Sequence, residues 1–173
     1  IVTWQHREKF KTTFRRRVIN LTNFLSDRVI ADSDPVAERY RREFGLDQEF
    51  VKTVPIAGIK PGQFPLRQHR PKQKIMVGSI GRLVPSKNFA ELEEIAENLS
   101  ECDINFRIAG DGPERSNLEK IIKRKGLKNI EFVGEIQDIP RFLSEVDIYI
   151  QPSQSEGLCM TVIEAMAAGL PIV

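Results

Sequence analysis

Residues 146–173 read VDIYIQPSQSEGLCMTVIEAMAAGLPIV, and this stretch decides the fold. The apolar run at 146–150 predicts a strand, and the mostly apolar segment at 160–168 predicts a helix. A polar loop, QPSQSEG at 151–157, separates the two, and the apolar residues at 171–173 begin a further strand. Apolar strands that alternate with helices are typical of a parallel sheet covered on both faces.

Two carboxylates in this stretch have the chemistry of ligand-binding groups. Glu156 lies in the polar loop, and Glu164 follows eight residues later, within the predicted helix. The unpaired N–H groups near Met160 and Thr161 would suit an anion such as a diphosphate. Glu164 lies among apolar side chains and needs either solvent or a polar ligand, such as the hydroxyls of a ribose. The spacing alone also allows a solvated helix carboxylate and a loop carboxylate favoured by the helix dipole.

The same alternation extends upstream over the second half of the chain. Predicted strands lie at 75–80, 104–109, 130–133, 147–151 and from 172 onward, and predicted helices lie at 87–99, 114–125, 137–145 and 160–168. This order predicts the α/β fold class, with a doubly wound parallel sheet. Ligands of such sheets bind beyond the carboxyl ends of the strands. The loops that follow the first four strands should therefore line one rim.

The N-terminal region shows a separate pattern. A stripe of apolar residues predicts a helix over 4–25, and a short strand is predicted at 28–31. A second helix is predicted from Asp34 as N-cap, Pro35 at the first helical position and Gly45 after the last turn.

The predicted helix at 4–25 has a basic face, made by Arg7, Lys9, Lys11, Arg15, Arg16 and Arg17. A basic amphipathic helix can lie on anionic lipid. The alternative is a packed helix whose charged face is solvated. The sequence leaves both interpretations open.

The domain prediction depends on a polar segment in the middle of the chain. A strand candidate at 50–55 precedes it, and residues 67–74, RQHRPKQK, contain no apolar residue beyond the proline and predict a linker. We therefore expect one domain at 1–66 and another at 75–173. The chain starts without Met and stops within an apolar run, so we expect a fragment that is truncated at both ends.

The composition of the 173 residues is that of a soluble globular protein, with 40% hydrophobic and 29% charged residues. A net charge of +2 gives no reason to expect a nucleic-acid partner. Two cysteines are too few for a disulfide framework, which makes a cytoplasmic location the default expectation. No apolar run approaches the roughly 20 residues that a membrane span requires.

Five motifs occur in the order, and at roughly the spacing, of a known family. They are GRLVPSKN (81–88), IAGDGPE (108–114), IEFVGEIQD (130–138), VDIYIQPSQSEG (146–157) and EGLCMTVIEAMAAGLPIV (156–173). The chain resembles the retaining glycosyltransferases of family four, which have the GT-B fold and an E-x7-E signature. The resemblance is dense over 74–173 and looser over 26–66. It implies that 75–173 is the Rossmann-like, nucleotide-sugar-binding half of a GT-B fold and that 1–66 is the tail of the acceptor domain.

The resemblance implies roles for four charged residues. Arg82 and Lys87 would clamp the donor diphosphate and stabilise the charge that develops on it, without a metal ion or cofactor. Taken alone, these two residues would be interpreted as an ordinary surface pair. Glu156 would lie at the donor sugar, and Glu164 would hold the ribose hydroxyls.

The remaining donor-binding residues follow from the same resemblance. The nucleotide base would pack around Val133 and Gly134, and N–H groups near Met160 and Thr161 would approach the distal phosphate. Two glycines that adjoin the charged residues complete the predicted set: Gly81 and Gly157.

The implied reaction is transfer of a hexose from a nucleoside diphosphate sugar to a hydroxyl of a glycan or lipid-linked acceptor, with retention of anomeric configuration. We expect this chain to carry donor binding only, because the resemblance places acceptor binding in the domain that is mostly missing. A peripheral contact with the inner face of the membrane is also allowed. Two alternatives are a nucleotide-binding module without catalysis and a sugar-nucleotide epimerase. The chain departs from the family pattern at Asn88, where Gly often follows the lysine, and at 55–60, which replaces a P-N-G-type turn.

Overall fold

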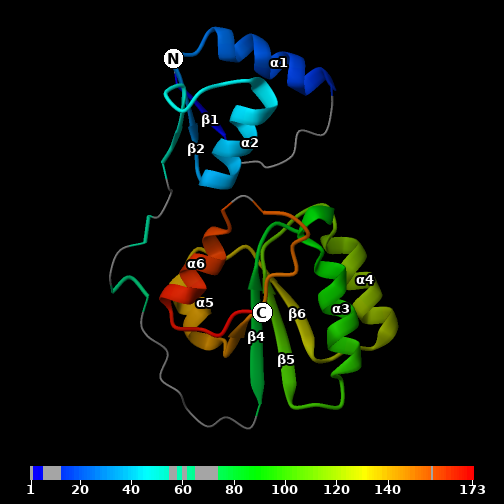
Figure 1. Cartoon of the computed structure of the whole chain (residues 1–173). Helices are drawn as coiled ribbons and strands as arrows, with labels where there is room; N and C mark the ends of the chain where they lie inside the picture. Colours follow the sequence, from blue (N-terminus) through cyan, green and yellow to red (C-terminus); the bar gives the residue numbers. More distant parts are fainter. Residues whose placement is uncertain (1, 6–12, 55–57, 60–61, 65–73, 157) are drawn as a thin grey trace. The chain divides into compact units, whose positions relative to one another are not determined.

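The computed structural model describes residues 2–5, 13–54, 58–59, 62–64, 74–156 and 158–173. The chain divides into two compact units, shown in Figure 1. The first comprises Ile1–Gly58 together with Ser155–Cys159, and the second comprises Ile59–Gln154 together with Met160–Val173. Of the predicted linker at 67–74, only Lys74 is among the described residues.

The first unit is a small parallel sheet with two helices. Its strands β1 (Val2–Gln5), β2 (Arg28–Ala31) and β3 (Val51–Thr53) pair in the order β1-β2-β3. Helix α1 (Thr13–Phe24) connects β1 to β2, and α2 (Asp34–Phe44) connects β2 to β3. The buried core combines the sheet with α2 and consists of Val29, Ala31, Val36, Ala37, Tyr40 and Val51.

The structure corrects two predictions in this unit. The helix predicted over 4–25 begins only at Thr13, and Trp4 instead pairs with Ile30 in the sheet. Pairing between distant segments therefore outweighs the local apolar stripe. The N-cap of α2 is Ser33, one residue before the predicted Asp34, whereas Gly45 ends the helix in the left-handed conformation (φ 67°) as predicted.

The second unit contains a four-stranded, fully parallel sheet. Its strands are β4 (Ile75–Ile80), β5 (Ile104–Ala109), β6 (Ile130–Gly134) and β7 (Ile148–Tyr149), in the order β6-β5-β4-β7. The chain therefore builds outward from β4 to β6 and then returns to the other side of β4. Such a reversal defines the switch point at which doubly wound sheets bind ligands. The predicted fold class is confirmed.

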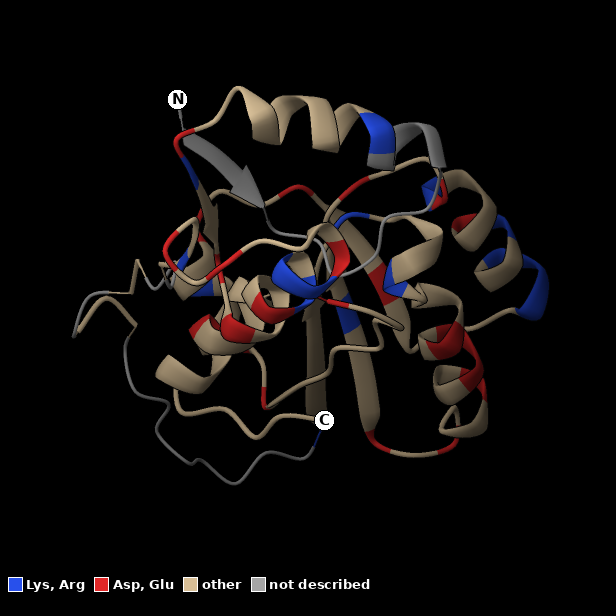
Figure 2. Ribbon diagram, turned by 45° about the horizontal axis from the view of Figure 1, so that its top comes forward, with Lys and Arg blue, Asp and Glu red and all other residues tan. Residues whose placement is uncertain are grey.

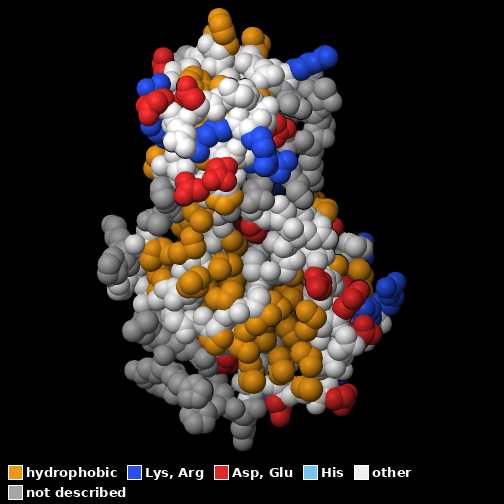
Figure 3. Space-filling view, viewed as in Figure 1, with side chains coloured by type: hydrophobic (Ala, Val, Ile, Leu, Met, Phe, Trp, Pro, Cys, Tyr) orange, Lys and Arg blue, Asp and Glu red, His pale blue; other side chains and the backbone are white. Residues whose placement is uncertain are grey.

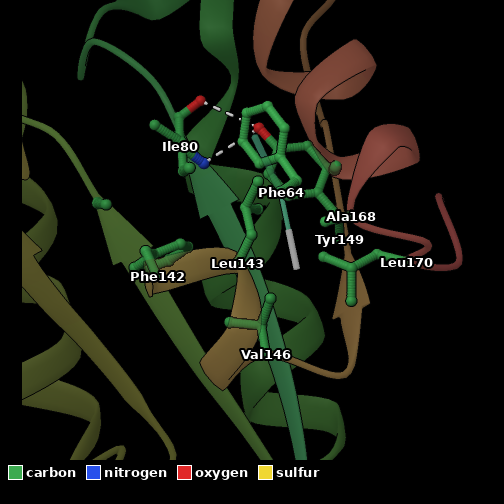
Figure 4. Close-up of a cluster of buried hydrophobic side chains, with 10 residues drawn as sticks. Phe64, Ile80, Phe142, Leu143, Val146, Tyr149, Ala168 and Leu170 are labelled. Atoms are coloured by element: carbon green, nitrogen blue, oxygen red, sulfur yellow. Dashed lines mark hydrogen bonds between the residues drawn. The ribbon is translucent and has the colours of Figure 1, made fainter. Parts of the chain in front are cut away.

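Helices cover both faces of this sheet, as Figure 1 shows. Helices α3 (Phe89–Asn98) and α4 (Arg115–Lys125) pack on one face, where the core includes Val77, Phe106 and Ile108. Helices α5 (Ile139–Glu145) and α6 (Met160–Ala167) pack on the other. The core of this second face, drawn in Figure 4, contains Phe64, Ile80, Ala109, Phe142, Leu143, Val146, Tyr149, Ala165, Ala168 and Leu170.

The predicted elements of the second unit agree with the structure in position, with two differences. The helix predicted at 87–99 is divided at Asn88, which separates the 3-10 helix η1 (Pro85–Lys87) from α3. The strand predicted from 172 onward is present as a single bridge between Ile172 and Tyr149.

Candidate functional site

A cavity of about 310 Å³ lies at the carboxyl ends of β4, β5 and β6. Three loops contribute its walls, one after each strand: Ile80, Gly81 and Arg82 follow β4, Gly110 and Asp111 follow β5, and Glu135, Ile136 and Ile139 follow β6. This is the edge at which the sequence predicted a binding site. Beside apolar side chains, the cavity walls carry the guanidinium group of Arg82 and the carboxylates of Asp111 and Glu135. An anionic end of a ligand would therefore be placed at Arg82.

Backbone hydrogen bonds and glycines bring these loops together. Gly81 N donates to Ala109 O at 2.9 Å, and Gly110 N donates to Gly134 O at 2.7 Å. Gly110 has a φ of 132°, and a Cβ atom there would lie 2.0 Å from the carbonyl oxygen of Gly81. Only glycine fits this position, because any side chain would push the two loops apart.

The predicted cations lie on the loop after β4. Arg82 is exposed and lines the cavity, while Lys87 is half-buried at the end of η1. The stem of Lys87 runs beside Gly81, since a Cβ atom on that glycine would lie 3.8 Å from Lys87 Cδ. The next residue, Asn88, adopts a left-handed conformation with φ 55°. This explains how Asn replaces the family's glycine here, because Asn tolerates that conformation better than most residues.

Asp111, one of two acidic residues that line the cavity, already has hydrogen-bond partners. Its carboxylate accepts a hydrogen bond from Gly112 N at 2.6 Å and pairs with Arg115 at 2.9 Å. The Gly112 amide and the Arg115 guanidinium together hold the pKa of Asp111 below its usual value. Asp111 therefore shapes its loop and remains ionised.

Glu164 has the least satisfied carboxylate in the described part of the chain. It lies half-buried in α6, and its Oε2 atom is buried without a hydrogen-bond partner among the described residues. Burial raises the pKa of this carboxyl group. Met160 and Thr161 are half-buried in the first turn of the same helix. A ligand hydroxyl that donated to Glu164 would remove the cost of its buried oxygen.

Of the ten predicted site residues, two line this cavity, Gly81 and Arg82. Val133 is 40% exposed and lines a second cavity, of about 410 Å³, with Arg107 and Phe142 among its walls. Its direction follows from the alternation of β6, in which Glu131 and Val133 are the exposed positions. Glu156 is half-buried in the segment Ser155–Cys159 of the first unit, and Gly157 lies outside the described residues. The remaining predicted residues of the second unit are not part of the cavity lining: Lys87, Gly134, Met160, Thr161 and Glu164.

Sequence reasoning did not single out Glu135, Ile136 or Ile139 as part of the site. Their position directly after β6, a strand that the apolar pattern predicted, could have indicated that they line the site. It also missed Tyr149 and Gln151, whose hydrogen bonds join β4 to α6. Nothing in the apolar pattern of β7 shows that Tyr149, a core residue, also forms these hydrogen bonds.

Two features are absent from the described residues. No group of three or more His, Cys, Asp and Glu side chains in the described part of the chain is arranged to hold a metal ion. Among the same residues, no helix has both the length and the apolar character that a membrane crossing requires.

The fold and the cavity define a nucleotide-binding type of α/β unit, and comparisons assign it to a family. Residues 64–173 match the family described as glycosyl transferases group 1. The chain therefore belongs to this family.

The relatives of the chain extend well beyond it. An uncharacterized glycosyltransferase of Haemophilus influenzae is 32% identical over 181 residues, a match that covers 99% of this chain and 49% of that protein. A GDP-mannose-dependent alpha-mannosyltransferase of Mycolicibacterium smegmatis is 31% identical over 154 residues, covering 86% of this chain and 39% of that protein. The chain thus spans about half the length of the first of these relatives.

Solved structures support the fold. Alr3699/HepE of Anabaena, determined in complex with UDP and glucose, matches with a TM-score of 0.82 at 24% identity, over 99% of this chain and 51% of that one. The pneumococcal O-GlcNAc transferase GtfA, in complex with UDP and GlcNAc, matches with a TM-score of 0.83 at 20% identity, over 99% of this chain and 36% of that one. These likenesses identify the chain as part of a GT-B fold.

Proposed function

We propose that this chain is the donor-binding part of a retaining glycosyltransferase, which moves a hexose from a nucleoside diphosphate sugar to a hydroxyl acceptor. The observation that carries the proposal is the cavity at the carboxyl ends of β4, β5 and β6, which is lined by Arg82 at the switch point of the sheet. Membership of the glycosyl transferases group 1 family supports the same conclusion.

In the proposed reaction the bond between the sugar's anomeric carbon and the diphosphate oxygen breaks, and its electron pair goes to the diphosphate. The oxygen of the acceptor hydroxyl forms the new bond to the anomeric carbon, and its proton passes to the departing diphosphate. Arg82 and Lys87 neutralise that charge, the former by a bidentate contact and the latter as a point charge. N–H groups near Met160 and Thr161 bind the distal phosphate. Cationic side chains and backbone donors thereby supply the electrostatic stabilisation, and the proposal includes no metal ion or cofactor.

Two groups hold the rest of the donor in this proposal. Glu164 accepts hydrogen bonds from the ribose hydroxyls, which its unsatisfied buried oxygen supports. Glu156 and the adjacent Gly157 contact the donor sugar. The loop after β6 holds the base, through backbone groups around Val133 and Gly134.

The names of relatives support this class of donor. The Anabaena structure contains UDP and glucose, and the mycobacterial relative is described as GDP-mannose-dependent. Both donors are nucleoside diphosphate sugars, but their bases and sugars differ. We therefore propose the class of donor and leave the base and the sugar open.

We propose that the acceptor, a glycan or a lipid-linked hydroxyl, binds to protein outside this chain. The Haemophilus influenzae relative is about twice as long as this chain. On this proposal the chain alone binds the donor but transfers nothing, and repeated turnover in a transfer assay followed by mass spectrometry would contradict it.

Calorimetric titration with UDP, GDP, ADP and their sugar conjugates tests donor binding. We expect saturable binding of one base, weakened about tenfold or more by Arg82→Ala, because a charge-assisted contact is lost. Arg42→Ala is the matched control, since Arg42 is an exposed arginine on α2 of the first unit. A folded chain that binds none of these compounds, or an Arg82→Ala variant with unchanged affinity, would overturn the proposal.

We also propose a peripheral contact between α1 and the anionic inner face of a membrane. Large apolar side chains of this helix face solvent, as Figure 3 shows, and four large hydrophobics at its C-terminal end are 43–86% exposed: Val18, Leu21, Phe24 and Leu25. Exposed Arg17 lies beside them. Apolar and basic groups on one helix are typical of interfacial binding. Cosedimentation with phosphatidylglycerol vesicles should be lost in a Leu21→Ser, Phe24→Ser double variant; unchanged cosedimentation would disprove the contact.

A further inference from the structure

The hydroxyl group of Tyr149 lies where β7 separates from its neighbour β4. Strands β4 and β7 pair over only two residues, Val77 with Ile148 and Gly78 with Tyr149. Beyond that point the Tyr149 side chain, which is fully buried, reaches across to Ile80 at the end of β4 (Figure 4). Its oxygen lies 3.2 Å from Ile80 N and 3.3 Å from Ile80 O. The side chain therefore continues the connection between the strands after the backbone ladder has ended.

Hydrogen bonds continue from Tyr149 to the first turn of α6. The Tyr149 hydroxyl accepts from Ile80 N and has Gln151 Oε1 as its shortest acceptor, at 2.9 Å. Thr161 Oγ1 donates to the same Gln151 oxygen at 3.4 Å. The Gln151 amide nitrogen donates to Ser153 Oγ at 2.7 Å, which fixes the orientation of the amide.

The same loop is tied to the segment that carries Lys87. Gln154 N donates to Ser86 O at 3.2 Å, within η1. The loop 151–154 thus contacts both groups that are proposed to grip the diphosphate, namely the loop after β4 and the start of α6.

We infer that Tyr149 and Gln151 are positioning residues for the diphosphate, holding the loop of Arg82 and Lys87 at a fixed separation from the N-terminal turn of α6. The inference rests on the proposed function, because it names what these residues hold in place. Neither side chain needs to touch the ligand. A site that binds one anion between two elements depends on such supporting contacts. If either element is displaced, the anion can no longer reach its partners on both elements at the right distance.

The test compares diphosphates with monophosphates of the same base, using UDP, GDP and ADP against UMP, GMP and AMP in calorimetric titrations of the whole chain. Tyr149→Phe removes one oxygen from the core, and Gln151→Met keeps the length of a half-buried loop side chain while removing its amide. We expect each to weaken diphosphate binding about fivefold to tenfold. Monophosphate binding should change less, so that the preference for the diphosphate shrinks.

A matched control separates positioning from stability. Tyr40→Phe makes the same chemical change in the first unit, where the Tyr40 hydroxyl is buried and bonded to Asn23 Oδ1 at 2.6 Å. It should leave nucleotide binding unchanged. Diphosphate binding that survives both Tyr149→Phe and Gln151→Met, or that falls equally in Tyr40→Phe, would overturn this inference alone. No nucleotide binding by the unmodified chain would overturn the proposed function and this inference with it.

Discussion

At the scale of single residues, Glu164 shows how a binding group can oppose stability. Burial raises the pKa of its carboxyl group above the value in the unfolded chain. Between those two values the folded chain holds a proton that the unfolded chain has released, so stability falls as pH rises through this window. Above the window an ionised carboxylate stays partly buried with one unsatisfied oxygen.

We therefore predict that Glu164→Gln stabilises the folded chain and weakens its binding of a nucleoside diphosphate. At neutral pH the variant should melt at a higher temperature than the unmodified chain, and the gap should close below about pH 4, where the carboxyl group is protonated in both states. Nucleoside diphosphate affinity should fall about tenfold or more, because a charged acceptor for hydroxyl groups is lost. Thermal melts across pH and calorimetry measure both effects. If the variant bound nucleoside diphosphates with unchanged affinity, Glu164 would not be part of the binding site.

Asn88 allows a second prediction at this scale. Its left-handed backbone, with φ 55°, separates η1 from α3 next to Lys87. Asn88→Ala should cost about 1–2 kcal/mol, because a Cβ atom without a local polar group is strained there. Asn88→Gly should retain stability within about 0.5 kcal/mol, since glycine adopts this conformation freely. Urea unfolding measures both, and equal losses in the two variants would show that the Asn88 side chain matters more than its backbone.

The residue scale also shows what sequence reasoning could and could not predict about the site. Arg82 lies at the edge where its loop was expected, because βα loops in a parallel sheet lie at the carboxyl ends of the strands, and its contact with a diphosphate stays a prediction. Val133 was placed with the nucleotide base, which stays a prediction, and its side chain lines a second cavity that shares Ile136 with the first. Glu131 and Val133 are the exposed positions in the regular alternation of β6, but which cavity they reach depends on how α5 packs, and that packing has no local sequence signal.

At the scale of helices and strands, an ion pair links α3 to α4. Lys125 lies in the basic last turn of α4, seen in Figure 2, and its Nζ atom is 2.9 Å from Glu93 and 2.8 Å from Glu97 on α3. The two acidic partners differ in environment, because the side chain of Glu93 is 6% exposed and that of Glu97 is 50% exposed.

This difference predicts unequal effects of the same substitution. Glu93→Gln should lower the free energy of unfolding by about 1–3 kcal/mol, because a buried charge-assisted hydrogen bond is lost. Glu97→Gln, the matched control, should change it by less than about 1 kcal/mol, as solvent already screens that pair. Denaturant unfolding of the two variants provides the comparison. A larger effect at Glu97 would mean that the helices are not joined through the buried pair.

Elements were predictable where local pattern and tertiary packing agree. Strand β5 was predicted at its observed bounds, because its apolar run is buried between helices and ends at Gly110. Strand β1 was interpreted as helix, because the apolar stripe that follows was extended back through Trp4. What makes residues 2–5 a strand is their parallel pairing with β2, some twenty-five residues further along the chain. No local pattern of four residues carries that information.

At the scale of the whole chain, the two units have separate cores. The buried cluster of the first unit lies between Val29 and Val51, and the two clusters of the second lie between Phe64 and Leu170. No buried residue belongs to a cluster of both units among the described residues. Since cooperative unfolding is a property of a shared core, we expect two calorimetric transitions from this chain, one for each unit.

The two buried tyrosines can assign these transitions. Tyr40→Phe leaves Asn23 without its donor, and Tyr149→Phe leaves Ile80 N without an acceptor, so each should cost about 1–3 kcal/mol in its own unit. A loss of 1 kcal/mol shifts the melting temperature of a domain of this size by roughly 4–8 °C. Tyr40→Phe should therefore lower the midpoint temperature of one transition, and Tyr149→Phe that of the other. A nucleoside diphosphate should raise the midpoint temperature only of the transition that Tyr149→Phe affects. If both variants lowered one single transition together, the units would unfold as one body, and donor binding would stabilise the N-terminal sheet as well.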